Sequence, residues 1–120
     1  MSYYSELVES RKLMEWFSDT VTGCGSVLLT LSDEDLGYNL FEEGHVDDAV
    51  FGFNQRELAE LKDKWLISED VYEKSVMLGN KIRELMDTEK WCYESVRNDK
   101  EWWDIMALAD EIKILMDDNK

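Results

Sequence analysis

The sequence contains no proline and few of the residues that carry catalysis. Its 120 residues include one histidine, His45, and two cysteines, Cys24 and Cys92, that are not spaced as a metal-binding or redox pair. It has no phosphate-binding Gly-x-x-x-x-Gly-Lys loop, no dinucleotide fingerprint and no Gly-x-Ser-x-Gly nucleophile turn. We therefore expect a protein that is not an enzyme, with no catalytic residues, no metal and no cofactor. Both cysteines are expected to be reduced thiols packed as small apolar residues.

Long apolar stretches are also missing. No run approaches the roughly 20 apolar residues that a helix needs to cross a bilayer. The segment 1–6 has neither the basic start nor the apolar run of a secretory signal. The sequence therefore predicts a cytoplasmic protein that does not associate with membranes.

Positive charge is scarce. The chain has 13 Lys and Arg against 28 Asp and Glu, which gives a formal net charge of −15. Nucleic-acid binding depends on Lys and Arg that neutralise phosphates, so this balance excludes nucleic acid as the expected ligand and favours a basic protein. No Lys or Arg occurs between Lys12 and Arg56, whereas this interval contains the acids Glu15, Asp19, Asp33, Glu34, Asp35, Glu42, Glu43, Asp47 and Asp48.

The residues that are present favour one helical domain. A chain of 120 residues with 44% hydrophobic and 12% aromatic residues can bury a core without disulfides or metals. Apolar residues recur at helical spacing over 3–22, 58–65, 71–85 and 102–116, and a shorter helical turn is expected over 91–96. The sequence therefore predicts a mainly α, bundle-like single domain of four to five helices spanning 1–120.

Three of these helices have recognisable starts. Ser68 is an expected N-cap, because carboxylates that favour the helix dipole follow it. Asn54 with Glu57, and Asn98 with Glu101, have the spacing of capping boxes.

The segment 23–53 is less regular, and it contains five of the six glycines: Gly23, Gly25, Gly37, Gly44 and Gly52. The run 27–31 favours β structure but is too short to distinguish a strand from a buried helix. The next residues, 32–35, either start a short helix or form the loop of a small hairpin. Irregular acidic segments of this kind often carry binding function.

Metal sites are a weaker interpretation of the same segment. Counting a calcium-binding loop from Asp33, the fifth, sixth and twelfth positions are Gly37, Tyr38 and Gly44, which do not match the required residues. Glu42 and His45 have the spacing used in di-iron bundles, but one histidine supplies only one of the two required pairs. A small carboxylate–metal hydrolase would require several acids of 33–48 to converge on one cation.

Two adjacent tryptophans complete the list of candidates. Trp102 and Trp103 point about 100° apart on a helix, so at least one of them is expected at the rim or surface. An exposed tryptophan among acids is typical of a protein-binding hot spot. The residues predicted to bind a partner are therefore Asp33, Glu34, Asp35, Glu42, Glu43, Asp47, Asp48 and Trp103.

In these general properties the chain resembles the immunity proteins of contact-dependent growth-inhibition and colicin systems, which are short, acidic, cytoplasmic and free of catalytic motifs. The resemblance implies a 1:1 heterodimer with a basic nuclease toxin domain. Two other functions remain open. One is a nucleic-acid mimic that inhibits a defence enzyme, and the other is an adaptor or structural module that packs its C-terminal apolar stripe against another helix.

Overall fold

In the computed structural model the described residues are 3–41, 46, 49, 52–53, 55–63, 66–86 and 88–118. Their elements are α1 (Tyr3–Gly23), the 3-10 helix η1 (Ser26–Thr30), α2 (Asp33–Phe41), α4 (Gln55–Asp63), α5 (Glu69–Leu85), α6 (Tyr93–Asn98) and α7 (Lys100–Asp118). No strand occurs in these ranges, so the prediction of a mainly helical protein is confirmed. None of the described helices is long and apolar enough to cross a membrane.

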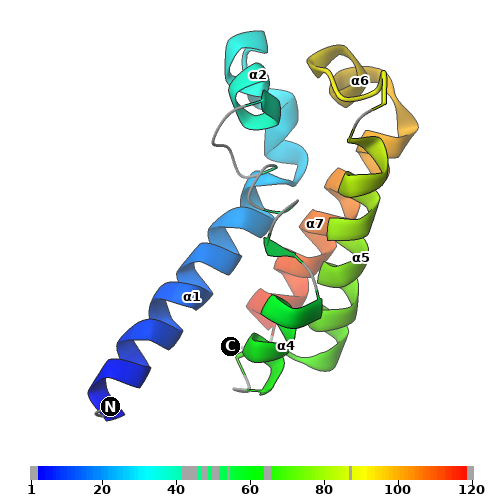
Figure 1. Cartoon of the computed structure of the whole chain (residues 1–120). Helices are drawn as coiled ribbons and strands as arrows, with labels where there is room; N and C mark the ends of the chain where they lie inside the picture. The colour runs from blue at the N-terminus through cyan, green and yellow to red at the C-terminus, as the bar shows by residue number, and fades with distance from the viewer. Residues whose placement is uncertain are drawn as a thin grey trace.

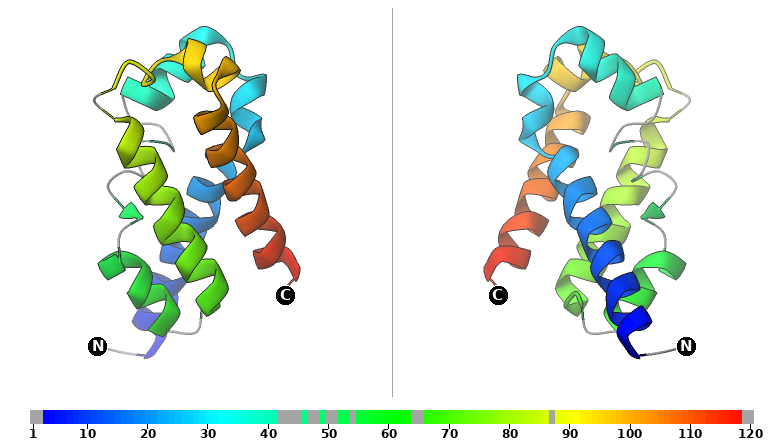
Figure 2. Two further views of the ribbon diagram at one scale, coloured as in Figure 1. Left: turned by 90° about the vertical axis from the view of Figure 1, so that its right-hand side faces the viewer. Right: turned by 90° about the vertical axis from the view of Figure 1, so that its left-hand side faces the viewer.

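The long helices lie along an elongated molecule of 47 × 25 × 24 Å. Helices α5 and α7 run in opposite directions side by side, and α1 packs against α7 on another side (Figures 1 and 2). Helix α4 packs against α5 near the end that holds the C-terminus. Helices α2 and α6 contact each other at the opposite end of the bundle (Figure 1).

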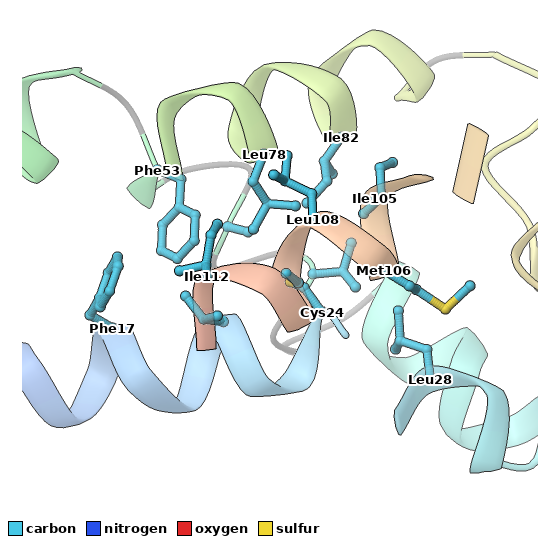
Figure 3. Close-up of a cluster of buried hydrophobic side chains, with 14 of the residues drawn as sticks. Phe17, Cys24, Leu28, Phe53, Leu78, Ile82, Ile105, Met106, Leu108 and Ile112 are labelled. Atoms are coloured by element: carbon cyan, nitrogen blue, oxygen red, sulfur yellow. The ribbon is translucent and has the colours of Figure 1, made fainter. Parts of the chain in front are cut away.

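The predicted apolar stripe of α7 forms the centre of the core (Figure 3). Trp102, Ala109 and Ile112 are completely buried, as are Phe17 of α1 and Ile82 of α5. Because α7 uses this face to pack against α1 and α5, the stripe that an adaptor would offer to another chain is buried inside the domain.

Of the three predicted helix starts, one is confirmed, one lies outside the described residues and one is wrong. Ser68 is the N-cap of α5, and its Oγ accepts a hydrogen bond from the Val71 N–H at 3.2 Å. Asn54 lies outside the described residues, although α4 does begin at Gln55. The capping box at Asn98 is wrong, because Asn98 is the last residue of α6 and its side-chain amide donates to the Glu94 carbonyl at 2.9 Å. Helix α6 extends two residues beyond the predicted turn, so α7 starts after Asp99.

The described part of segment 23–53 is helical, and the strand and hairpin alternatives are not found there. The run 26–30 forms η1, whose first N–H groups need an acceptor. The Asp110 carboxylate of α7 supplies it, accepting the Ser26 N–H at 3.1 Å. Gly25 permits this approach, since a Cβ at that position would collide with the Asp110 carboxylate. The acceptor for the start of η1 thus lies 84 residues away, which a sequence window cannot reveal.

Ser75 of α5 is a buried polar residue that gives a stability prediction. Its side chain is inaccessible to solvent, and its Oγ has no hydrogen-bond partner within the described part of the chain. We expect Ser75→Ala to raise the free energy of unfolding by about 1 kcal/mol, because it removes a desolvated hydroxyl and improves helix propensity. Chemical denaturation measures the change.

Thr20 of α1 provides the matched control, because it is equally buried but its Oγ1 donates to the Trp16 carbonyl at 2.7 Å. Thr20→Val keeps the shape and removes a satisfied hydroxyl, so it should not stabilise the protein. A loss of stability in Ser75→Ala would contradict the prediction.

Candidate partner-binding site

Four of the eight residues predicted to bind a partner can be placed. Asp33, Glu34 and Asp35 form the first turn of α2, and Trp103 lies in the first turns of α7. The other four candidates, Glu42, Glu43, Asp47 and Asp48, lie outside the described residues, as does His45.

The start of α7 is held by the preceding turn, which fixes the direction of its tryptophans. Trp102 is fully buried, its indole Nε1–H donates to the Lys90 carbonyl at 2.7 Å, and its ring lies 5.5 Å from the Trp91 ring. With Trp102 fixed inward, the next residue of the helix must point away from the core. Trp103 is accordingly 49% exposed, so the expectation of one outward tryptophan is confirmed.

An ion pair joins the same turn to α7. Lys90 Nζ lies 2.8 Å from a Glu101 carboxylate oxygen. This hydrogen bond lowers the pKa of Glu101 and raises the pKa of Lys90. The stabilising effect of the pair is therefore lost as pH falls through the lowered pKa of Glu101, or as pH rises through the raised pKa of Lys90. Glu101 is exposed and Lys90 is partly exposed, so solvent screens the pair and its contribution to stability is small.

Trp103 and the acids of α2 are connected through Arg97 of α6. The indole Nε1–H of Trp103 donates to the Arg97 carbonyl at 3.1 Å. The Arg97 guanidinium donates to Asp33 Oδ1 from Nε at 3.2 Å and from Nη2 at 2.8 Å, and Nη2 also donates to the Leu31 carbonyl at 2.8 Å. Arg97 therefore holds the start of α2 against α6 and α7. We call Asp33, Glu34, Asp35, Arg97 and Trp103 the acidic corner.

The backbone of α2 arranges the three carboxylates. Ser32 caps the helix, its Oγ accepting the Asp35 N–H at 3.2 Å. Acids in the first turn interact favourably with the positive end of the helix dipole. All three carboxylates are exposed, and the Arg97 guanidinium pairs with that of Asp33. Three carboxylates and one guanidinium give the acidic corner two net negative charges, and the half-exposed Trp103 is joined to α2 through Arg97.

This arrangement can attract and stack against cations. Indole faces bind guanidinium and ammonium groups, and nearby carboxylates increase the attraction. Across the residues whose side chains are described, no cluster of three or more His, Cys, Asp or Glu side chains is placed to hold a metal ion. The site is thus an electrostatic and aromatic surface.

No protein-family model, curated protein or solved structure matches this chain. The functional argument depends on the geometry and charge of the acidic corner, together with the composition of the chain.

Sequence reasoning missed Arg97, the residue that assembles the corner. The only signal was indirect, because the acidic interval between Lys12 and Arg56 has no cation of its own. Any Lys or Arg that pairs with the start of α2 must therefore come from outside this interval. The spacing of 64 residues between Arg97 and Asp33 gives no indication of which cation supplies it.

The unequal roles of Asp33 and Glu34 can be tested on the protein alone. Asp33→Asn removes the charge that pairs with Arg97, so we expect the free energy of unfolding to fall by about 1 kcal/mol at low salt and by less at high salt. Glu34→Gln should change it by less than about 0.5 kcal/mol. Urea titrations at two salt concentrations measure both variants, and equal losses would show that the Arg97 contact has no special role.

Proposed function

We propose that this chain is a small acidic binding protein of the cytoplasm that neutralises a basic partner, and that the partner is a bacterial nuclease toxin domain bound as a 1:1 heterodimer. One observation carries the proposal. Trp103 is half exposed and donates a hydrogen bond to the Arg97 carbonyl, and the side chain of the same Arg97 pairs with Asp33 of α2, in a chain with a net charge of −15.

The chemistry of nucleases supports this choice of partner. A nuclease needs a cationic cleft to hold phosphates. A compact protein with a large negative charge is steered onto such a cleft, and this steering raises the association rate. The affinity of the complex then depends on a few buried hot-spot residues, among which tryptophan is one of the commonest. The acidic corner offers both elements at one end of the molecule.

The shape of the corner favours a cap over a mimic of nucleic acid. A mimic needs carboxylates in a row at the spacing of phosphates. Asp33, Glu34 and Asp35 are successive residues of one helical turn, so their side chains diverge by about 100° each. This divergence suits insertion into a concave cationic surface.

Co-expression tests the proposal directly. We expect a basic toxin domain to be encoded beside this chain in its own genome. That domain should stop growth when expressed alone, and growth should return when both are expressed. The purified pair should elute as a 1:1 complex in size-exclusion chromatography with light scattering. Equal toxicity with and without this chain would refute the proposal, as would turnover of a substrate by this chain alone.

A further inference from the structure

The outward side of α7 continues the exposed surface that begins at Trp103. Trp103, Ala107 and Ile114 are spaced by four and seven residues, so they lie along one side of the helix. Trp103 is 49% exposed, Ile114 is 60% exposed, and Ala107 between them is exposed. This line extends over about three turns of the helix.

The 3-10 helix η1 lies beside this line. Asp110 belongs to the same side of α7, one turn from both Ala107 and Ile114, and its carboxylate binds the Ser26 N–H at 3.1 Å. Helix η1 packs against α7 and exposes two aliphatic side chains, Val27 at 42% and Leu29 at 45%. We call Val27, Leu29, Trp103, Ala107 and Ile114 the α7–η1 surface.

Acidic groups border the α7–η1 surface. The acidic corner lies at its Trp103 end, and Asp104 and Glu111 lie along the neighbouring side of α7, where they pair with Lys100 and Lys74. Single exposed apolar residues are normal on a soluble protein. Apolar side chains gathered from two adjacent elements and surrounded by charges have instead the composition of a protein interface.

We infer that the α7–η1 surface is the docking face for the basic partner, which covers it with aliphatic side chains set among arginines or lysines. Charge complementarity decides the occupant, since a second copy of this chain would add another charge of −15 and repel the first. The inference rests on the proposed function for the identity of the natural partner. The chemistry of the surface can be tested without that partner.

Two short peptides serve as probes. The first alternates arginine with leucine, and the second has serine in place of each leucine and therefore the same charge. Binding is measured by calorimetry at about 0.15 M salt, where long-range charge effects are screened. The leucine peptide is expected to bind about tenfold more tightly than the serine peptide, because only leucine can cover the apolar centre.

Two matched variants locate the binding. Ile114→Arg places a cation in the α7–η1 surface, and Met77→Arg places the same charge on α5, where Met77 is 49% exposed outside this surface. Ile114→Arg is expected to weaken the leucine peptide roughly tenfold, whereas Met77→Arg should weaken it less than about twofold. Thermal melting checks that both variants remain folded.

Four results would overturn the inference, three with the purified chain and one with a toxin. Equal affinity for the two peptides would remove the apolar contribution, and equal weakening by the two variants would place the binding elsewhere. A concentration-dependent dimer that Ile114→Arg abolishes, seen by sedimentation at high salt, would assign the surface to self-association. If the variants behave as expected but no toxin is neutralised, the surface stands and the proposed function fails. If a toxin is neutralised equally by both variants, the proposed function stands and the surface fails.

Discussion

Replacing Gly79 with alanine is expected to lower the free energy of unfolding by about 3 kcal/mol, although alanine is the better helix former. Gly79 lies within α5, where the backbone of Phe53 packs against the helix. A Cβ at Gly79 would collide with the Phe53 carbonyl oxygen and would lie 2.9 Å from the Phe53 Cβ. Backbone atoms cannot rotate aside as the end of a flexible side chain can, so the whole of Phe53 would have to shift.

Moving Phe53 would disturb two further contacts. Its ring is fully buried and lies 5.4 Å from the Phe17 ring and 5.8 Å from the Trp16 ring, which joins α1 to α5. Its carbonyl accepts a hydrogen bond from Arg83 Nη2 at 3.2 Å. The expected loss therefore exceeds the gain of about 1 kcal/mol from helix propensity.

Gly37 of α2 is the matched control for Gly79. It is also a helical glycine, but a Cβ there would meet no atom within 4 Å. Gly37→Ala should therefore raise the free energy of unfolding by about 0.5–1 kcal/mol. Chemical denaturation of both variants measures the difference, and stabilisation by both would show that Phe53 does not press on α5.

The helices could be predicted from the sequence where their buried residues repeat at regular spacing within the helix. The stripe of Val71, Leu78 and Ile82 in α5 and that of Trp102 and Ile112 in α7 repeat at the period of a helix, and all five residues are buried. The apolar residues that repeat at this period lie on the side of the helix that faces the core. For that reason the mainly helical fold, and the expectation that one of Trp102 and Trp103 faces outward, follow from the pattern alone.

The elements that depend on distant contacts could not be predicted. The segment 26–30 forms η1, and the acceptor for its first N–H is the distant Asp110 carboxylate. The acidic corner exists because Arg97 reaches Asp33 across 64 residues. In the sequence, Gly79 is only an unfavourable residue within a helix. The close approach of the Phe53 backbone explains why glycine occurs there. Contacts between side chains far apart in the sequence leave no periodic signal, so spacing rules do not detect them.

Replacing Trp103 with alanine is expected to weaken binding of the basic partner by about 30-fold or more, the loss that defines an aromatic hot spot. Its indole is the largest exposed side chain of the acidic corner, and the hydrogen bond to the Arg97 carbonyl holds it ready for contact. A preorganised ring loses little conformational freedom on binding, so most of its contact energy contributes to affinity.

The association and dissociation rates distinguish the contact made by Trp103 from the attraction exerted by the carboxylates. Trp103→Ala should raise the dissociation rate and leave the association rate nearly unchanged, whereas Glu34→Gln should lower the association rate and reduce its salt dependence. Surface plasmon resonance at two salt concentrations measures both rates. Trp103→Phe is the control, since it keeps a ring but loses the hydrogen bond, and it should retain much of the affinity. If Trp103→Ala slowed association instead, the indole would act through the position of Arg97 and the neighbouring acids, and contact between the ring and the partner would be disproved.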